Sequence, residues 1–119
     1  MATDIKSSAV ITTTALDADG LSTAAAVGNN AALTLGGALT SGGSYTADTG
    51  TARQITLLSA GNDSGITFTV VGTDVNGDAL SETVTGANAG TATSTGYFAT
   101  ISSITAVGNP AGNMSAGIN

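Results

Sequence analysis

The residues best suited to chemistry in this chain are carboxylates that stand in turns rich in glycine and asparagine. The stretch from Asp74 to Asp78, DVNGD, places two carboxylates and the Asn76 amide at alternate positions. This spacing is typical of the start of a calcium-binding loop. The glycine comes two positions too early, however, and Thr85 stands where a bidentate glutamate belongs. The sequence therefore favours a solvated turn, with calcium bound by Asp74, Asn76 and Asp78 as the alternative.

Most other catalytic chemistry is excluded because the residue types that perform it are missing. The chain has no cysteine, histidine or tryptophan, which removes disulfides, thiolate nucleophiles, Ser-His-Asp arrangements and imidazole metal sites. Only carboxylates, hydroxyls, Lys6 and Arg53 remain for acid–base work. The acidic residues are scattered mostly at turns, including an Asx turn predicted at Asp17-Ala18-Asp19-Gly20. We expect a protein that is not an enzyme and needs no cofactor; a hydrolase that uses loop carboxylates is the alternative.

The charge balance limits the partners that the protein can have. The net charge is −6, and Lys6 and Arg53 are the only basic residues. Nucleic acids and anionic membrane surfaces are bound by clustered lysine and arginine, so neither is an expected partner. No apolar run is long enough to span a bilayer, and the N-terminal residues lack the features of a secretory signal. We expect synthesis in the cytoplasm without export.

The pattern of side chains predicts an all-β fold. Thr, Ser, Gly, Ala and Val dominate, whereas the charged residues that cover helix surfaces are scarce. Ile66, Phe68 and Val70 alternate with Thr67 and Thr69, as in a strand with one buried face. Similar runs between Gly- and Asn-containing turns predict about seven antiparallel strands in a single small β-sandwich or Greek-key-like barrel. The runs are Ala9–Leu16, Ala31–Leu35, Gln54–Leu58, Ile66–Val71, Leu80–Thr85, Tyr97–Ile104 and Asn113–Ile118.

The two halves of the chain differ in composition. Residues 1–50 are rich in Ala, Gly and Ser with weak alternation, and we predict an irregular N-terminal arm with loosely patterned strands there. Residues 51–119 contain both phenylalanines and most of the clean alternation, so we expect the sandwich core there. The length fits one domain overall. Because alanine supplies much of the apolar content, the core is expected to be thin, and contacts between copies of the chain are expected to add stability.

The Asn76-Gly77 turn is compatible with two hairpin registers. A two-residue turn would pair residues 75 and 78 and would direct the apolar residues of the two strands to opposite faces. A three-residue loop that starts at Val75, with Gly77 in the left-handed conformation, pairs residue 74 with 78 and sets Phe68 opposite Val84. We predict the second register because it buries a single face.

This register also determines the surroundings of one acidic side chain. Glu82 falls between Leu80 and Val84 on the buried side, where a carboxylate needs a partner. Arg53 is the only basic residue in the body of the chain. We therefore predict an ion pair between Arg53 and Glu82.

Part of the chain resembles small structural proteins of tailed bacteriophages, such as those that decorate capsids or form head fibres and tail surfaces. The resemblance lies between Arg53 and Ile104, and it is carried by SAGNDSGITFTV at 59–70, GTD at 72–74 and NG at 76–77. It continues through SET at 81–83, GANAG at 86–90 and YF at 97–98. The residues that carry it make up less than half of the chain, and residues 1–50 lie outside it.

The resemblance implies a virion structural protein on the outer capsid surface. The leading interpretation is a capsid decoration or cement protein that binds the major capsid protein and stabilises the shell, as a homo-oligomer or as clustered copies. The alternative is a host-surface binding module of a fibre or tailspike, with glycans as one ligand class. Tyr45 is the candidate for contact with a partner, since aromatic side chains often anchor interfaces.

Overall fold

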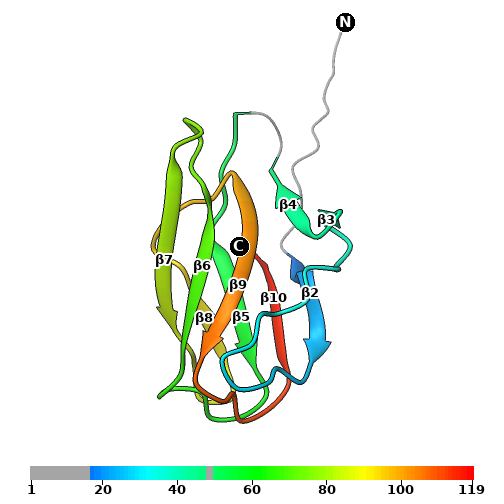
Figure 1. The fold of residues 1–119 in the computed structure, drawn as a ribbon, viewed down its shortest axis with the longest axis vertical. Helices are drawn as coiled ribbons and strands as arrows, with labels where there is room; N and C mark the ends of the chain where they lie inside the picture. Colours follow the sequence, from blue (N-terminus) through cyan, green and yellow to red (C-terminus); the bar gives the residue numbers. More distant parts are fainter. Residues whose placement is uncertain (1–16, 48–49) are drawn as a thin grey trace, which may run out of the picture.

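Two antiparallel sheets pack face to face in this protein (Figure 1). The computed structural model describes residues 17–47 and 50–119. One sheet has the strand order β2-β10-β5-β8 and the other has the order β3-β4-β9-β6-β7. This arrangement confirms the predicted all-β sandwich. The strands, labelled as in Figure 1, are β2 (Asp17–Ala25), β3 (Thr40–Ser41), β4 (Ser44–Thr46), β5 (Ile55–Ser59), β6 (Thr67–Thr73), β7 (Ala79–Thr85), β8 (Thr91–Thr93), β9 (Thr100–Val107) and β10 (Met114–Ile118).

Most strands predicted in the C-terminal half are found. The runs at 54–58, 66–71, 80–85 and 113–118 correspond to β5, β6, β7 and β10, with small shifts at their ends. The run predicted at Tyr97–Ile104 is displaced, because β9 begins only at Thr100. Phe98 belongs to the preceding loop, where it forms an isolated bridge with Arg53. The strand predicted at Ala9–Leu16 lies outside the described residues.

The strand predicted at Ala31–Leu35 is wrong in its extent. Ala32 forms only an isolated bridge with Thr105 of β9. The segment runs beside β9 through single hydrogen bonds, such as the one from Leu33 N to Ile104 O at 2.8 Å. Leu33 and Leu35 are nevertheless buried. The alternation therefore identified core residues correctly but overstated the regular pairing.

The N-terminal half contributes strands to both sheets. β2 lies where the sequence indicated an Asx turn. It pairs with β10 through Met114 opposite Ala25, Ala116 opposite Ser22 and Ile118 opposite Asp17, and the register shifts between each of these pairs and the next. These irregularities break the two-residue alternation and hide the strand in the sequence. β3, β4 and β8 are too short to show a period. The described residues thus form nine strands, and β2, β3, β4 and β8 were not among the predicted runs.

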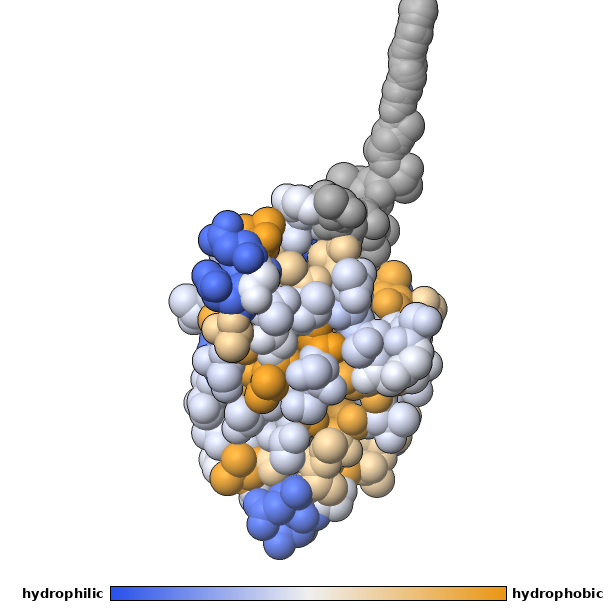
Figure 2. Space-filling model, turned by 45° about the horizontal axis from the view of Figure 1, so that its top comes forward, coloured by the Kyte–Doolittle hydropathy of each residue, from blue (hydrophilic) through white to orange (hydrophobic). Residues whose placement is uncertain are grey.

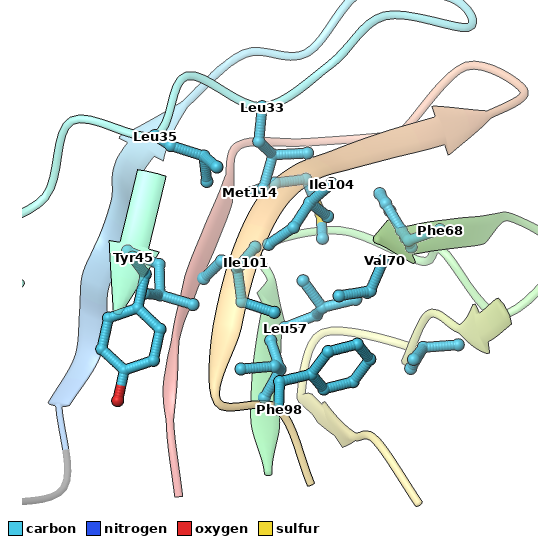
Figure 3. Packing of buried hydrophobic residues seen from close by; sticks show 14 of the residues in the cluster. Leu33, Leu35, Tyr45, Leu57, Phe68, Val70, Phe98, Ile101, Ile104 and Met114 are labelled. Carbon is cyan, nitrogen blue, oxygen red and sulfur yellow. The ribbon is translucent and has the colours of Figure 1, made fainter. Parts of the chain in front are cut away.

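The core lies between the two sheets and draws on both halves of the chain. Inward-facing residues of β6 and β9 meet residues of β5 and β10 (Figure 3). Tyr45 and Leu21 come from the N-terminal half and are as deeply buried as the rest. The core residues are Leu21, Leu33, Leu35, Tyr45, Ile55, Leu57, Phe68, Val70, Val84, Phe98, Ile101, Ile104, Ala106, Met114, Ala116 and Ile118.

The hairpin of β6 and β7 adopts the predicted register. Phe68 pairs with Val84, and Val70 pairs with Glu82. The amide of Asp74 donates to the carbonyl of Asp78 at 2.9 Å, and Gly77 has a φ of 84°. Only glycine adopts this left-handed conformation without strain, so the three-residue loop with Gly77 at its last position is confirmed.

Candidate functional site

The acidic residues at the tip of the β6–β7 hairpin organise their own turn. Asp74 Oδ1 accepts hydrogen bonds from the amides of Asn76 at 2.8 Å and of Asp78 at 3.0 Å. Asp17 makes a similar contact at the start of β2, where its Oδ1 accepts from the amide of Asp19 at 3.3 Å. The described part of the chain contains no group of three or more acidic side chains placed to hold a metal ion. Residues 75–78 are exposed, and Asp74 closes the turn that they form.

Glu82 lies on the predicted side of β7 but has a different partner from the one predicted. Its Oε2 accepts from the amide of Thr95 and its Oε1 from the amide of Gly96, both at 2.7 Å. These amides lie in the loop that follows β8, so Glu82 links the edges of the two sheets. A Cβ atom at position 96 would lie 2.9 Å from Glu82 Oε1, which explains a glycine there.

The predicted ion pair between Arg53 and Glu82 is wrong, because backbone amides bind the Glu82 carboxylate. The carboxylate of Glu82 is bound by two adjacent backbone donors, which satisfy it as an arginine would. Arg53 Nε donates instead to the carbonyl oxygen of Asn119 at 3.0 Å. Arg53 thus ties the end of the chain to the segment that precedes β5.

Asp63 is a buried acidic residue that the sequence did not reveal. Its side chain is fully buried, and its Oδ1 accepts from the amide of Ala111 at 2.6 Å. Its own amide donates to the carbonyl of Ala87 at 2.9 Å. Asp63 therefore joins three loops at one end of the sandwich. Among the described residues, its buried Oδ2 has no hydrogen-bond partner.

The two tyrosines occupy opposite environments. Tyr45, the predicted partner contact, is 4% exposed and belongs to the core (Figure 3). Its ring is buried because β4 pairs with β9 opposite Ile101, an inward-facing position. Tyr97 is 57% exposed. The aromatic side chain available to a partner in the described structure is therefore Tyr97 rather than Tyr45.

The outer face of the five-stranded sheet carries no charge across its three long strands. On β6, β7 and β9, the residues that alternate with the core point outward and form cross-strand rows, most of them with hydroxyl side chains. Val71 and Val107 lie among them and are 37% and 53% exposed. The rows are Thr85, Thr67 and Val107; Thr83, Thr69 and Thr105; Ser81, Val71 and Ser103; and Ala79, Thr73 and Thr100. We call these twelve residues the hydroxyl face.

The colouring by hydropathy agrees with this description. Figure 2 shows weakly hydrophilic residues over most of the visible surface, with strongly hydrophilic residues gathered in small patches near its two ends. A large surface without charged residues is suited to close contact with another surface, because no charge must be removed from water. The hydroxyl face is therefore the best candidate for a functional surface.

Comparisons with known proteins add no family to this geometry. No family model matches the chain, and neither a curated protein nor a solved structure matches it. The described residues also include no helix that is long and apolar enough to cross a bilayer.

Replacing Glu82 tests its role as a link between the sheets. We expect Glu82→Ala to lower the free energy of unfolding by about 1.5–3 kcal/mol, because two amides lose a charged acceptor. Glu82→Gln should lose about half as much, since one oxygen acceptor remains. Asp78→Asn, which removes an exposed charge next to the same strand, should change stability by less than about 0.5 kcal/mol. Urea unfolding measures all three; equal effects of Glu82→Ala and Asp78→Asn would contradict this role.

Asp63 allows a comparison of two substitutions at one buried position. Asp63→Asn keeps the acceptor for the Ala111 amide and removes the buried charge, so we expect stability to change by less than about 1 kcal/mol. Asp63→Ala leaves that amide unpaired and should cost about 1–3 kcal/mol. Thermal unfolding followed by circular dichroism separates the two. An Asn variant as unstable as the Ala variant would show that the acceptor for the Ala111 amide is not the main contribution of this side chain.

Proposed function

We propose that this protein is a virion structural component, a capsid decoration or cement protein that binds the major capsid protein and stabilises the shell. It acts on the outer capsid surface, after synthesis in the host cytoplasm. Its work is done by contact between surfaces and requires no catalytic residue and no cofactor. The hydroxyl face is the surface that we assign to the shell.

The uncharged hydroxyl face is the observation that carries this proposal. Solvent-facing sheets usually include charged side chains that keep the surface hydrated and prevent association. The twelve positions of the hydroxyl face hold none. Small hydroxyl side chains let another backbone approach closely, and Val71 and Val107 offer apolar area to bury. Such a face fits a broad, flat partner such as a shell.

The use of the acidic side chains also supports a non-enzymatic role. Asp17, Asp74 and Glu82 all accept hydrogen bonds from backbone amides of nearby turns or loops. Asp63 does the same in the protein interior. Carboxylates that hold loops in place in this way are poorly suited to proton transfer with a substrate, since their hydrogen-bonding capacity is already used.

The resemblance of residues 53–104 to structural proteins of tailed bacteriophages supports the major capsid protein as the partner. The segment that carries it includes β6 and β7, which provide most of the hydroxyl face. The net charge of −6 argues against nucleic acid or an anionic membrane as the surface that is bound. A protein shell remains the partner that these properties fit best.

The test compares two exposed apolar residues on opposite sheets. Val71 lies at the centre of the hydroxyl face, and Leu58 is similarly exposed on the outer side of β5, with exposed fractions of 37% and 40%. We expect Val71→Lys to weaken binding to purified shells by about tenfold or more, because a lysine at the centre of an interface must be desolvated. Leu58→Lys should bind like the parent chain. Co-sedimentation of each variant with shells that lack the protein measures this.

The copy number of the protein in purified particles tests the same proposal without substitutions. Quantitative mass spectrometry should give a number comparable with that of the major capsid protein. A number comparable with that of a tail component would contradict the proposal and favour a fibre or tailspike module. Equal shell binding by the Val71→Lys and Leu58→Lys variants would show that another surface contacts the shell.

A further inference from the structure

We propose that the open edge of β7 pairs with the same edge of a second copy of the chain, in an antiparallel register centred on Thr83. The pairing joins the two five-stranded sheets into one continuous sheet across a twofold axis. The inference goes beyond the proposed function, because it concerns association of the protein with itself in solution and involves no shell.

The edge of β7 presents a regular row of backbone groups. β7 pairs only with β6, and the hydrogen bond from Asp74 N to Asp78 O sets which residues bond across that pair. In an antiparallel pair, alternate residues direct their amide and carbonyl groups away from the partner. No hydrogen bond between described residues uses these outward groups, which on β7 belong to Ala79, Ser81, Thr83 and Thr85.

This edge lacks the features that usually prevent strand addition. Lysine, proline, a bulge or an inward-pointing charge commonly protects an edge strand. β7 contains neither lysine nor proline, and its register with β6 is regular over all seven residues. Its one charged side chain, Glu82, points inward and is bound by the amides of Thr95 and Gly96. A strand added to this edge therefore meets no unpaired charge on β7.

The other edges in the described structure are shorter or partly used. β8 has three residues and β3 has two. On β2, Leu21 O accepts a hydrogen bond from Gly37 N at 3.1 Å. Next to it, Gly20 O accepts from Leu39 N at 2.8 Å. β7 is thus the longest open edge among the described residues, and the described strand that best matches it in length and in free backbone groups is a second β7.

Backbone geometry and charge limit the register of such a pair. Outward groups must face outward groups, so the longest symmetric pairings are centred on Ser81, Glu82 or Thr83. The register centred on Glu82 places two carboxylate residues directly opposite each other, which is destabilising. The register centred on Ser81 places Asp78 opposite Val84 of the second copy, and Asp78 thereby becomes a diagonal neighbour of Glu82 of that copy. Both registers bring like charges together.

The register centred on Thr83 keeps the acidic residues apart and matches side chains on both faces of the sheet. On the inner face it sets Glu82 opposite Val84, and Asp78 lies about 20 Å along the strands from Glu82 of the second copy. On the outer face it sets Thr83 opposite its own copy and Ser81 opposite Thr85, so that hydroxyl groups meet hydroxyl groups. The hydroxyl faces of the two copies then lie on the same side of the joined sheet.

The absence of cysteine from the chain allows a direct test of this register. Residues that exchange backbone hydrogen bonds have Cα atoms about 5.5 Å apart, which suits a disulfide. Thr83→Cys should therefore form a disulfide-linked dimer under mild oxidation. Ser81→Cys should not, because its two copies lie about 14 Å apart along the joined strands. Thr93→Cys, at an exposed position on β8, is the matched control and should stay monomeric on non-reducing electrophoresis.

Proline substitutions in the full-length chain test the reversible association. Thr83→Pro removes an outward amide and no bond to β6, a position where an edge strand tolerates proline. Thr93→Pro is the matched control, because the Thr93 amide also faces outward, on β8. We expect the dissociation constant for self-association to rise about tenfold or more for Thr83→Pro and to stay unchanged for Thr93→Pro. Molar mass from light scattering over a range of concentrations measures it.

Amide hydrogen exchange of the unsubstituted chain provides a measurement that does not depend on any variant. The amides of residues 81, 83 and 85 should be protected at high protein concentration and should lose protection on dilution. The amide of residue 79 should exchange quickly at both concentrations, because it lies beyond the end of β7 of the second copy in this register.

Three results would overturn the inference. They are a monomer at every concentration measured, association that Thr83→Pro leaves unchanged, and a disulfide-linked dimer of Ser81→Cys in place of one of Thr83→Cys. None of these results bears on binding to shells, so the proposed function is tested separately.

Discussion

The pairing of β6 with β7 on one side and β9 on the other is the constraint on which the rest of the structure depends. It directs Phe68 and Val70 into the core and leaves the threonines between them on the outer surface. A slip of one residue would exchange the two sets, because strand side chains alternate. The hairpin loop with Gly77 at its end sets the register. The core and the hydroxyl face are therefore two results of one pairing.

Backbone amides bind four acidic side chains of the described structure, those of Asp17, Asp63, Asp74 and Glu82. The chain has only two basic residues for eight acidic ones, so ion pairs can serve few of the carboxylates. Glu82 links the two sheets through loop amides, and Asp63 joins three loops at one end of the sandwich. These contacts link separate elements of the sandwich and place no charge on the hydroxyl face.

The sequence predicted those features that local spacing determines. The turn residues and alternation around Asn76-Gly77 were sufficient for the hairpin register, because both the loop and the apolar face must agree. β2 escaped prediction because its two register shifts break the alternation. The position of Glu82 was predicted but its partner was not, since any residue type can supply a backbone amide. Burial of Asp63 depends on loops far along the chain, near Ala87 and Ala111, which no local pattern reveals.

One register of β6 and β7 separates the core from the hydroxyl face, and proton NMR of the full-length protein tests this register most directly. In this register Thr69 and Thr83 form a pair without mutual hydrogen bonds, which brings their Cα atoms to about 4.5 Å. A strong nuclear Overhauser contact between the α protons of Thr69 and Thr83 is the predicted result. A contact of Thr83 with Val70 in its place would indicate the slipped register and would contradict the account.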